Sequence, residues 1–226
     1  MTIEQFGLDP EILEILKNQG IVDFYPPQAE ALPYALRGEH LVLSIPTAAG
    51  KSLVAYLAIA QRLKHEGGKA FYIVPLRALA REKYEDLKAF EPLGLKIGIS
   101  TGELDESDVR LSKFDIIVCT SEKADSLLRH GLHWIDKIKV LVIDEIHLIH
   151  DPTRGPTLEV IIAQIKALNP ATQLIALSAT IKNAVELADW LGGKLIQSDW
   201  RPVVLKEGVF FHNIIKYNDS STKKIA

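Results

Sequence analysis

Short apolar runs alternate with amphipathic stretches along most of the chain. Several of these runs are almost continuous in Val, Ile and Leu, which indicates strands that are buried on both faces, as in a parallel sheet. The runs that predict strands are 40–45, 69–74, 95–100, 114–119, 138–144 and 173–178. The amphipathic stretches that predict helices are 52–65, 78–90, 121–129, 156–168 and 183–191. This alternation predicts an α/β domain with a mostly parallel, twisted sheet and helices on both faces.

Two further helices are predicted before the first strand. Asp9 can cap the first of them, in front of Pro10, and Gly20 follows its end. The second spans roughly residues 27–37 and holds Pro33 near its middle. After Trp190 the pattern changes to extended, β-branched runs without another strong helix, so the regular alternation ends there.

Composition narrows the class of protein. The chain has 226 residues and a formal net charge of −3, so a nucleic-acid partner has to be held by local groups and not by a global positive field. Its single cysteine, Cys119, lies in an apolar run, which predicts a buried hydrophobic residue and not a nucleophile. The histidines are not grouped with cysteines or carboxylates at metal-ligand spacing, so we expect no zinc site. The N-terminus lacks a secretory signal and no apolar run is long enough for a bilayer, so we expect a cytoplasmic protein without a membrane partner.

The segment IPTAAGKS, residues 45–52, joins the first strand to an apolar-periodic helix. Backbone N–H groups at a helix N-terminus, together with the helix dipole, form an anion site. Gly50 lets the backbone approach a phosphate, Lys51 can reach the β- and γ-phosphates, and Ser52 can ligate Mg²⁺. Ile45 stands where the usual phosphate loop has glycine. A plain strand–helix turn with Lys51 in solvent is therefore the alternative.

Two carboxylates follow a later buried strand, in the segment VLVIDEIH. At the carboxyl end of a central parallel strand, Asp144 and Glu145 would lie beside the phosphate crevice. Asp144 can hold Mg²⁺, directly or through water, and Glu145 can polarise the water that attacks the γ-phosphate. The alternative is a pair of solvated loop acids.

An ordered set of motifs runs along almost the whole chain. They are FYPPQ, PTAAGKS, VPLRALAREKY, TGE, TSEKADSLLR, DEIH and SAT. Together they resemble the motifs of the first lobe of superfamily 2 helicases, which has a RecA-like P-loop NTPase fold, and their wording is similar to the superkiller-type branch. Within that branch, RGPTLE and WRPVVLKEGV resemble the archaeal Holliday-junction-migration (Hjm) helicases, which are 3′–5′ DNA helicases linked to fork repair.

This resemblance implies a role for each residue that matches a motif. Gln28 would recognise adenine, and the loop would hold the phosphates of ATP together with Mg²⁺. The loop residues are Ile45, Pro46, Thr47, Ala48, Ala49, Gly50, Lys51 and Ser52. The catalytic set would be Lys51, Asp144, Glu145 and His147, with Asp144 and Ser52 on the metal and Glu145 as the base. His147 would link the nucleotide state to the SAT segment, which is Ser178, Ala179 and Thr180.

The same resemblance assigns seven residues to the nucleic-acid side: Pro75, Arg77, Thr101, Gly102, Ser121, Glu122 and Lys123. Each lies near the carboxyl end of a predicted strand, so all of them face one edge of the sheet, where turns and helix starts offer N–H groups to phosphates. Contacts of this kind grip a backbone and carry little sequence information. Glu122 is equally well interpreted as a helix-start acid, and Lys123 as a solvated side chain.

The resemblance also implies a domain organisation and partners. Residues 1–200 would form a first RecA-like helicase lobe, and residues 201–226 a linker toward a second lobe that this chain lacks. The expected function is that of an ATP-dependent DNA helicase lobe, which couples ATP hydrolysis to translocation on single-stranded or branched DNA. We expect the chain alone to bind ATP·Mg weakly and to hydrolyse it poorly, because the arginine fingers come from the second lobe. An RNA helicase or remodeller lobe is one alternative, and a nucleotide-binding switch without motor activity is another.

Overall fold

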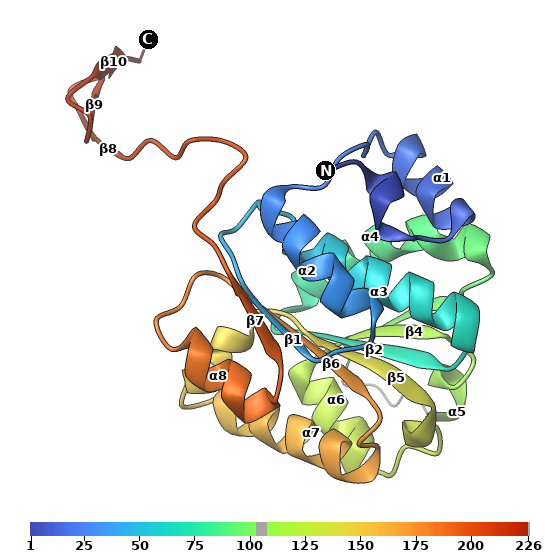
Figure 1. The fold of residues 1–226 in the computed structure, drawn as a ribbon. Coiled ribbons are helices and arrows are strands. Elements are labelled where there is room, and N and C mark those ends of the chain that lie inside the picture. The colour runs from blue at the N-terminus through green and yellow to red at the C-terminus, as the bar shows by residue number, and fades with distance from the viewer. Residues whose placement is uncertain (103–107, 226) are drawn as a thin grey trace.

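A computed structural model describes residues 1–102 and 108–225 of the chain. Its centre is a seven-stranded sheet in the order β3-β4-β2-β5-β6-β1-β7, in which every neighbouring pair is parallel (Figure 1). The strands are β1 (Leu41–Ser44), β2 (Lys69–Val74), β3 (Ile97–Ser100), β4 (Ile116–Thr120), β5 (Ile138–Ile143), β6 (Gln173–Ser178) and β7 (Lys194–Gln197). All six predicted strands and the α/β class are confirmed. The edge strand β7 lies in the extended region after Trp190, where the pattern singled out no strand.

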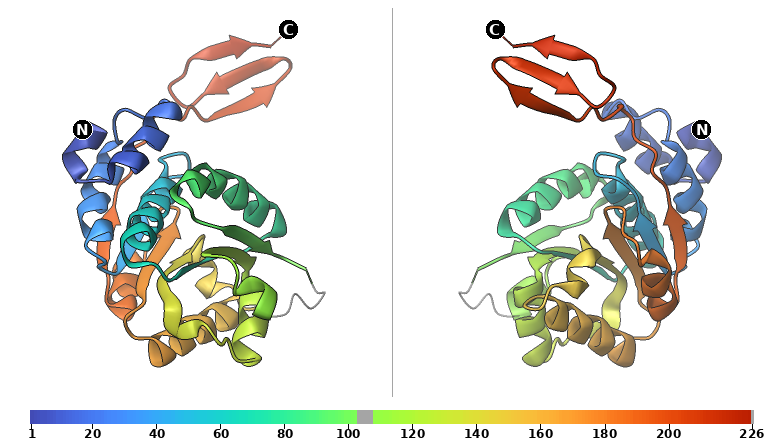
Figure 2. Two further views of the ribbon diagram at one scale, coloured as in Figure 1. Left: turned by 90° about the vertical axis from the view of Figure 1, so that its right-hand side faces the viewer. Right: turned by 90° about the vertical axis from the view of Figure 1, so that its left-hand side faces the viewer.

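Helices cover both faces of this sheet (Figures 1 and 2). On one side lie α1 (Pro10–Asn18), α2 (Pro26–Leu36), α3 (Lys51–Glu66) and α4 (Arg77–Leu87). On the other side lie α5 (Asp108–Leu111), α6 (Ser121–Arg129), α7 (Gly155–Leu168) and α8 (Ala184–Leu191). Short 3-10 helices form parts of the connections: η1 (Ile3–Phe6), η2 (Lys88–Leu93), η3 (Ile135–Lys137) and η4 (Ile146–His150). The predicted helices are all present, and the helix expected at 78–90 ends at Leu87 and continues as η2.

Successive side chains of each strand enter two different hydrophobic cores. Leu41 and Leu43 of β1 belong to the core that includes residues of α1, α2 and α3, whereas Val42 between them belongs to the core that includes residues of α6, α7 and α8. In the same way, Tyr72 of β2 lies in the first core and Phe71 in the second. Both faces of the sheet are therefore packed against apolar side chains and shielded from water. This explains why the strands are continuous apolar runs and do not alternate between apolar and polar residues.

The two N-terminal helices attach to α3. The Asp9 carboxylate accepts the N–H of Glu11 at 3.0 Å in front of Pro10, as the sequence predicts for a helix cap. The same carboxylate forms an ion pair with Lys64 of α3 at 2.8 Å. The second helix, α2, continues through Pro33 to Leu36. Both helices are thereby held against the helix that begins at the predicted phosphate loop.

The parallel strands deliver their carboxyl ends to one edge of the sheet. Ser44 of β1 is in register with Ser178 of β6, and Ile73 of β2 is in register with both Ile143 of β5 and Cys119 of β4. The predicted phosphate loop and Asp144-Glu145 therefore leave the sheet at the same level, as do the segments that begin at Pro75 and at Ser121. This is the edge where open α/β sheets bind their ligands.

The single cysteine is a core residue, as its apolar surroundings predict. Cys119 is fully buried in β4 and has no disulfide partner. Burial raises the pKa of its thiol, so the nucleophilic thiolate is disfavoured. Within the described residues, none of the helices combines the length and the apolar character that a membrane span requires.

The segment predicted as a linker contains a small antiparallel sheet. Strands β8 (Gly208–Phe211), β9 (Ile214–Tyr217) and β10 (Thr222–Lys224) form a meander that stands apart from the main body (Figures 1 and 2). The sequence pattern indicated extended backbone here and did not predict these strands one by one. Trp200, which precedes the meander, packs against the main body, with its ring 4.7 Å from that of Tyr25.

Gly155, the first residue of α7, lies where this helix approaches η4 closely. An added Cβ would lie 2.1 Å from the backbone oxygen of Ile149, which cannot rotate away as a side chain could. We expect Gly155→Ala to lower the free energy of unfolding by about 1–3 kcal/mol, which is the usual cost of overpacking. Chemical denaturation measures this change. Val160→Ala, at an exposed position of the same helix, is the control and is expected to change stability by less than about 0.5 kcal/mol; equal effects of the two substitutions would contradict the close packing.

Candidate nucleotide site and nucleic-acid groove

The predicted phosphate loop begins as a continuation of β1. Ile45 is fully buried, and its N–H donates to the backbone oxygen of Ser178 at 3.2 Å. The residue that departs from the usual loop pattern is thus the last buried residue of a strand extension. The turn itself follows, and its Ala49 N–H donates to the Pro46 oxygen at 3.2 Å.

Gly50 closes the loop at the start of α3. Its φ of 73° lies in the left-handed region, which glycine adopts without steric cost. An added Cβ would lie 2.2 Å from the Gln28 amide nitrogen. No side chain caps the first turn of α3, so its N–H groups are available to an anion at this helix N-terminus.

Lys51 is a buried residue and not a solvated one. Its side chain is only 9% exposed, and its ammonium lies 3.6 Å from a Glu145 carboxylate oxygen. A plain turn with a free lysine would leave this ammonium in water. The structure therefore joins the phosphate loop directly to the pair of carboxylates after β5.

Asp144 is the most buried acid of the site. It is 5% exposed, accepts the Tyr72 hydroxyl at 3.1 Å through one oxygen, and accepts the Glu145 N–H at 3.0 Å through the other. Burial raises the pKa of its carboxyl above the ordinary value of 3.8, and Glu145 adds to this effect. Lys83 and Lys51 act in the opposite direction. The interpretation of these acids as solvated loop residues does not hold for Asp144.

Lys83 is a residue of this site that the sequence motifs did not identify. Its side chain is 11% exposed, and its ammonium lies 2.8 Å from a Glu82 oxygen and 4.0 Å from Asp144. A periodicity signal was present, because Ala80, Lys83 and Leu87 share the buried face of α4. A lysine at a core position of an amphipathic helix points to a buried charged partner.

Tyr72 is a second residue that the sequence did not identify, because it lies in an apolar strand. Its hydroxyl donates to the Asp144 carboxylate at 3.1 Å. Burial and the Asp144 charge both raise the pKa of this phenol, so it stays a neutral donor. Asp144, one of the two predicted metal ligands, is thus held by a tyrosine hydroxyl from β2.

These side chains surround a cavity of about 340 Å³, which we call the phosphate cavity. Its lining is Thr47, Ala48, Gly50, Lys51, Ser52, Leu79, Glu82, Lys83, Asp144 and Glu145. Helix N–H groups and ammonium groups suit phosphate oxygens, whereas a hydroxyl and carboxylates suit a hard divalent cation. The residues present therefore fit a nucleotide with Mg²⁺. Two lining residues other than glycine, Ala48 and Glu145, have positive φ values of 70° and 53°, and strain of this kind concentrates at ligand sites.

Gln28 lies next to the loop but is engaged by the protein itself. Its side-chain oxygen accepts the Tyr25 N–H at 2.8 Å, and its amide donates to the Gly50 oxygen at 3.0 Å. Only 4% of the residue is exposed. These bonds tie the start of α2 to the phosphate loop. Recognition of adenine by Gln28 stays a prediction.

His147 connects the acids after β5 to the SAT segment. Its Nδ1 lies 3.3 Å from a Glu145 oxygen and 3.5 Å from the Ser178 hydroxyl, as expected for a residue between them. Ala179 is fixed through its oxygen, which accepts the Ser44 hydroxyl at 3.4 Å. Thr180 is exposed and lies beyond the end of β6. The described geometry therefore joins His147 to Ser178.

A second concavity of about 470 Å³ lies at the same sheet edge, over the ends of β2, β3 and β4, and we call it the edge groove. Its lining is Pro75, Leu76, Arg77, Thr101, Gly102, Thr120, Glu122, Lys123 and Ser126. Six of the seven residues predicted on the nucleic-acid side are in this lining. Glu103, the last residue of the TGE motif, lies outside the described residues.

Ser121 is the exception and does not line the edge groove. It is 2% exposed and is absent from the lining of this groove. Thr120 is also buried, at 6% exposure, but it does line the groove, and as the N-cap of α6 it accepts the Lys123 N–H at 3.4 Å. The hydroxyl at this position is therefore that of Thr120, one residue before the predicted one.

Comparison with known proteins gives consistent matches. A family model described as DEAD/DEAH box helicase matches residues 25–188. The ATP-dependent DNA helicase Hel308 of Pyrococcus horikoshii is 54% identical over 225 residues, which are 99% of this chain and 31% of that relative. A protein of the same name from Pyrobaculum calidifontis is 44% identical, with 100% of this chain and 32% of the relative covered. The chain thus spans about a third of the length of these relatives.

Solved structures agree on the fold. The DUF1998 helicase MrfA bound to DNA and AMPPNP has a TM-score of 0.73 and 25% identity, covering 85% of this chain and 29% of that one. A hypothetical ATP-dependent RNA helicase from Sulfolobus tokodaii has a TM-score of 0.70 and 18% identity, covering 84% of this chain and 57% of that one. These likenesses confirm the RecA-like fold that the motifs predict.

Burial of the Asp144 carboxylate predicts a pH-dependent cost. Its folded-state pKa lies above its ordinary value, so stability is lost as the pH rises through that folded-state pKa. Asparagine has no charge to bury, and we expect Asp144→Asn to raise the denaturation midpoint near pH 7 in metal-free buffer, with a smaller gain near pH 4. Denaturant titrations at the two pH values measure the effect. Asp189→Asn, at an exposed position, is the control, and a loss of stability in Asp144→Asn at neutral pH would contradict the expected sign.

Proposed function

The chain belongs to the DEAD/DEAH box helicase family, and on that premise we propose that it is the ATP-binding motor lobe of an ATP-dependent DNA helicase. In this function, ATP hydrolysis is coupled to translocation along single-stranded DNA. The observation that carries the proposal is the convergence of Lys51, Asp144 and Glu145 on one cavity at the sheet edge that also holds the edge groove. Relatives named ATP-dependent DNA helicase, at 44–54% identity, support the choice of activity.

The residues around the phosphate cavity would have different roles in binding ATP. The N–H groups at the start of α3 and the Lys51 ammonium would hold the phosphates of ATP, and Gln28 would recognise the adenine. Ser52 and Asp144 would hold Mg²⁺, which supplies positive charge to the phosphate oxygens when bound. The Tyr72 hydroxyl donates to Asp144 and would orient this ligand.

Glu145 is the residue we assign to the attacking water. Its carboxylate is partly exposed to the cavity, in contrast to the buried Asp144, so it can accept a proton from water. Its two oxygens contact Lys51 and His147. Phosphates that attract Lys51 would release one of these contacts. Through His147, this change would reach Ser178 at the end of β6.

The lining of the edge groove supports the proposal that it binds the backbone of a nucleic acid. Arg77 and Lys123 supply positive charge, and Thr101, Gly102 and Thr120 supply small side chains next to backbone N–H groups. Contacts of this kind read phosphates and not bases, so they suit a motor that moves along a strand. The names of the relatives favour DNA, with 3′–5′ movement at forks and junctions as the finer proposal. An RNA strand fits the same groove chemistry and is the second candidate substrate.

We also propose the domain organisation and location that accompany this activity. Residues 1–200 would be the first lobe and residues 201–226 the linker toward a second lobe, which is supported by relatives about three times as long. A second lobe would supply the arginine fingers, so the chain alone would hydrolyse ATP poorly. We propose a cytoplasmic location for this activity.

Replacement of Lys51 tests the nucleotide site. Loss of a charged contact to phosphate costs about 1.5–3 kcal/mol, so we expect Lys51→Ala to weaken Mg·ATP binding by roughly 10- to 100-fold. Displacement of a fluorescent ATP analogue measures the affinity. Lys113→Ala removes the same charge from an exposed position before β4 and is expected to bind normally. Equal affinities of the native chain and Lys51→Ala would refute the assignment.

Strand competition tests the choice of nucleic acid. We expect unlabelled single-stranded DNA to displace a labelled DNA strand from the chain at a lower concentration than RNA of the same sequence and length. Fluorescence anisotropy at low salt measures this, because backbone contacts weaken steeply as salt rises. Preferential displacement by RNA would favour the RNA helicase alternative.

A further inference from the structure

A third concavity continues the edge groove along the outer side of α4. It has a volume of about 490 Å³ and shares Arg77 and Thr101 with the edge groove. Its lining is Arg77, Ala78, Arg81, Tyr84, Glu85, Ile99 and Thr101, and we call it the α4 groove. Because two lining residues are common to both concavities, a chain-like ligand in one of them has a direct route into the other.

The α4 groove carries positive charge that the described residues do not neutralise. Arg77 and Arg81 are exposed, and within residues 1–102 and 108–225 neither of them forms an ion pair. Other arginines differ in this respect, since Arg37 pairs with Glu39 at 2.8 Å and Arg129 with Asp125 at 2.9 Å. An unpaired guanidinium in a concave surface has all of its donors available to an anion.

The acid of the α4 groove has a partner of its own. Glu85 lies 3.1 Å from the ammonium of Lys88, the first residue of η2. Its charge is therefore compensated locally, and the groove retains the charge of the two arginines. This charge complements a polyanion.

The spacing of the two arginines suits consecutive phosphates. Positions 77 and 81 are four residues apart, so they lie on one face of α4, with a rise of about 6 Å between them. This rise is comparable to the distance between neighbouring phosphates in an extended strand. A backbone held by Arg77 in the edge groove can therefore place its next phosphate at Arg81.

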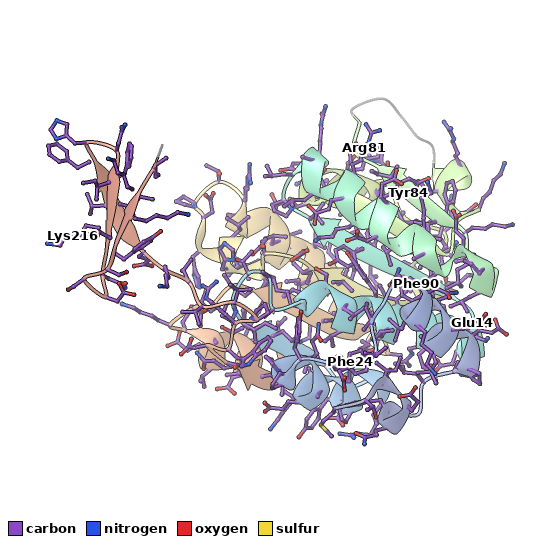
Figure 3. All side chains as sticks on the ribbon, turned by 90° about the horizontal axis from the view of Figure 1, so that it is seen from above. Glu14, Phe24, Arg81, Tyr84, Phe90 and Lys216 are labelled. Atoms are coloured by element: carbon purple, nitrogen blue, oxygen red, sulfur yellow. The ribbon has the colours of Figure 1, made fainter. Side chains whose placement is uncertain are left out.

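An aromatic ring completes the wall of the α4 groove. Tyr84 is half-buried and packs with Ile99 against the first hydrophobic core. Figure 3 shows Arg81 and Tyr84 along the same helix, at the end of the molecule away from Lys216 of the meander. The Lys88 ammonium lies 5.4 Å from the centre of this ring. A fixed aromatic ring beside a basic track is the arrangement with which proteins hold single strands without reading their sequence.

We propose that a single strand bound in the edge groove continues into the α4 groove, where Arg81 contacts a phosphate and Tyr84 packs against a base or sugar. This inference rests on the proposed function, because it extends the path of the same nucleic acid. It assigns Arg81, Tyr84 and Ile99 to strand binding. Arg81 and Tyr84 lie within the motif VPLRALAREKY, but none of the three is among the seven residues expected on the nucleic-acid side. The ligand is recognised by its backbone, so the site is independent of base sequence.

Salt-dependent binding separates this proposal from a structural role of Arg81. The affinity of the 226-residue chain for a single-stranded thymidine oligonucleotide of about 12 residues is measured from about 20 to about 200 mM salt, for the native chain and each variant. Arg81→Ala and Arg77→Ala are each expected to lower the slope of log affinity against log salt by about 0.7, the value for one phosphate contact on a single strand. Arg37→Ala removes an equal charge far from both grooves and is expected to leave the slope unchanged. Unaltered circular dichroism spectra verify that each variant is folded.

The uncharged wall gives a second, independent readout. Tyr84→Leu keeps apolar volume at the core but removes the aromatic ring, and we expect it to weaken binding about tenfold without a change of slope. With an oligonucleotide of about 4 residues, too short to occupy both grooves, the effect of Arg81→Ala is expected to shrink while that of Arg77→Ala remains.

The outcomes distinguish failure of the α4-groove proposal from failure of the proposed function. If Arg77→Ala lowers the slope and Arg81→Ala behaves like Arg37→Ala, the α4 groove is overturned and the edge groove stands. If neither arginine matters, or if the native chain binds no single strand at low salt, the nucleic-acid part of the proposed function fails as well.

Discussion

The parallel pairing of β1, β6, β5 and β2 is the constraint on which the rest of this structure depends. Parallel strands end at one edge, so the loop after β1 and the acids after β5 emerge at the same level. The segments after β2, β3 and β4 emerge at this edge too, and they line the edge groove. The phosphate cavity and the edge groove are therefore neighbours because of hydrogen-bond geometry, before any particular side chain is considered.

This placement of the loops brings oppositely charged groups of the phosphate cavity close together, so that their charges compensate one another. A buried carboxylate is costly, and Asp144 is tolerated because Tyr72 donates to it and two ammonium groups lie nearby. Glu145 is balanced in turn by Lys51. Each of these pairs crosses between elements that are far apart in the sequence. Removal of either partner would leave a charge in the cavity uncompensated, so these pairs depend on one another.

Further contacts connect the residues around the phosphate cavity to other parts of the molecule. Gln28 links the start of α2 to Gly50, and the neighbouring Tyr25 packs on Trp200 ahead of the meander. On the other side, His147 links Glu145 to Ser178 at the end of β6. The phosphate loop is thereby in contact with both the segment that leaves the main body and the neighbouring central strands. A ligand bound in the phosphate cavity would act through these contacts on the segment at Trp200 and on the end of β6.

The sequence by itself determined the elements and the residues that belong to local patterns. Continuous apolar runs predicted six of the seven strands of the main sheet, and helix-start chemistry next to Gly50 and Lys51 predicted the anion site, because both depend on neighbours along the chain. Only the tertiary structure decided which polar residues meet. Lys83 and Tyr72 join Asp144 across three elements, Thr120 and not Ser121 lines the edge groove, and no residue that the structure describes forms an ion pair with Arg81. Such relations depend on distances between segments separated by tens of residues, and a one-dimensional pattern does not contain them.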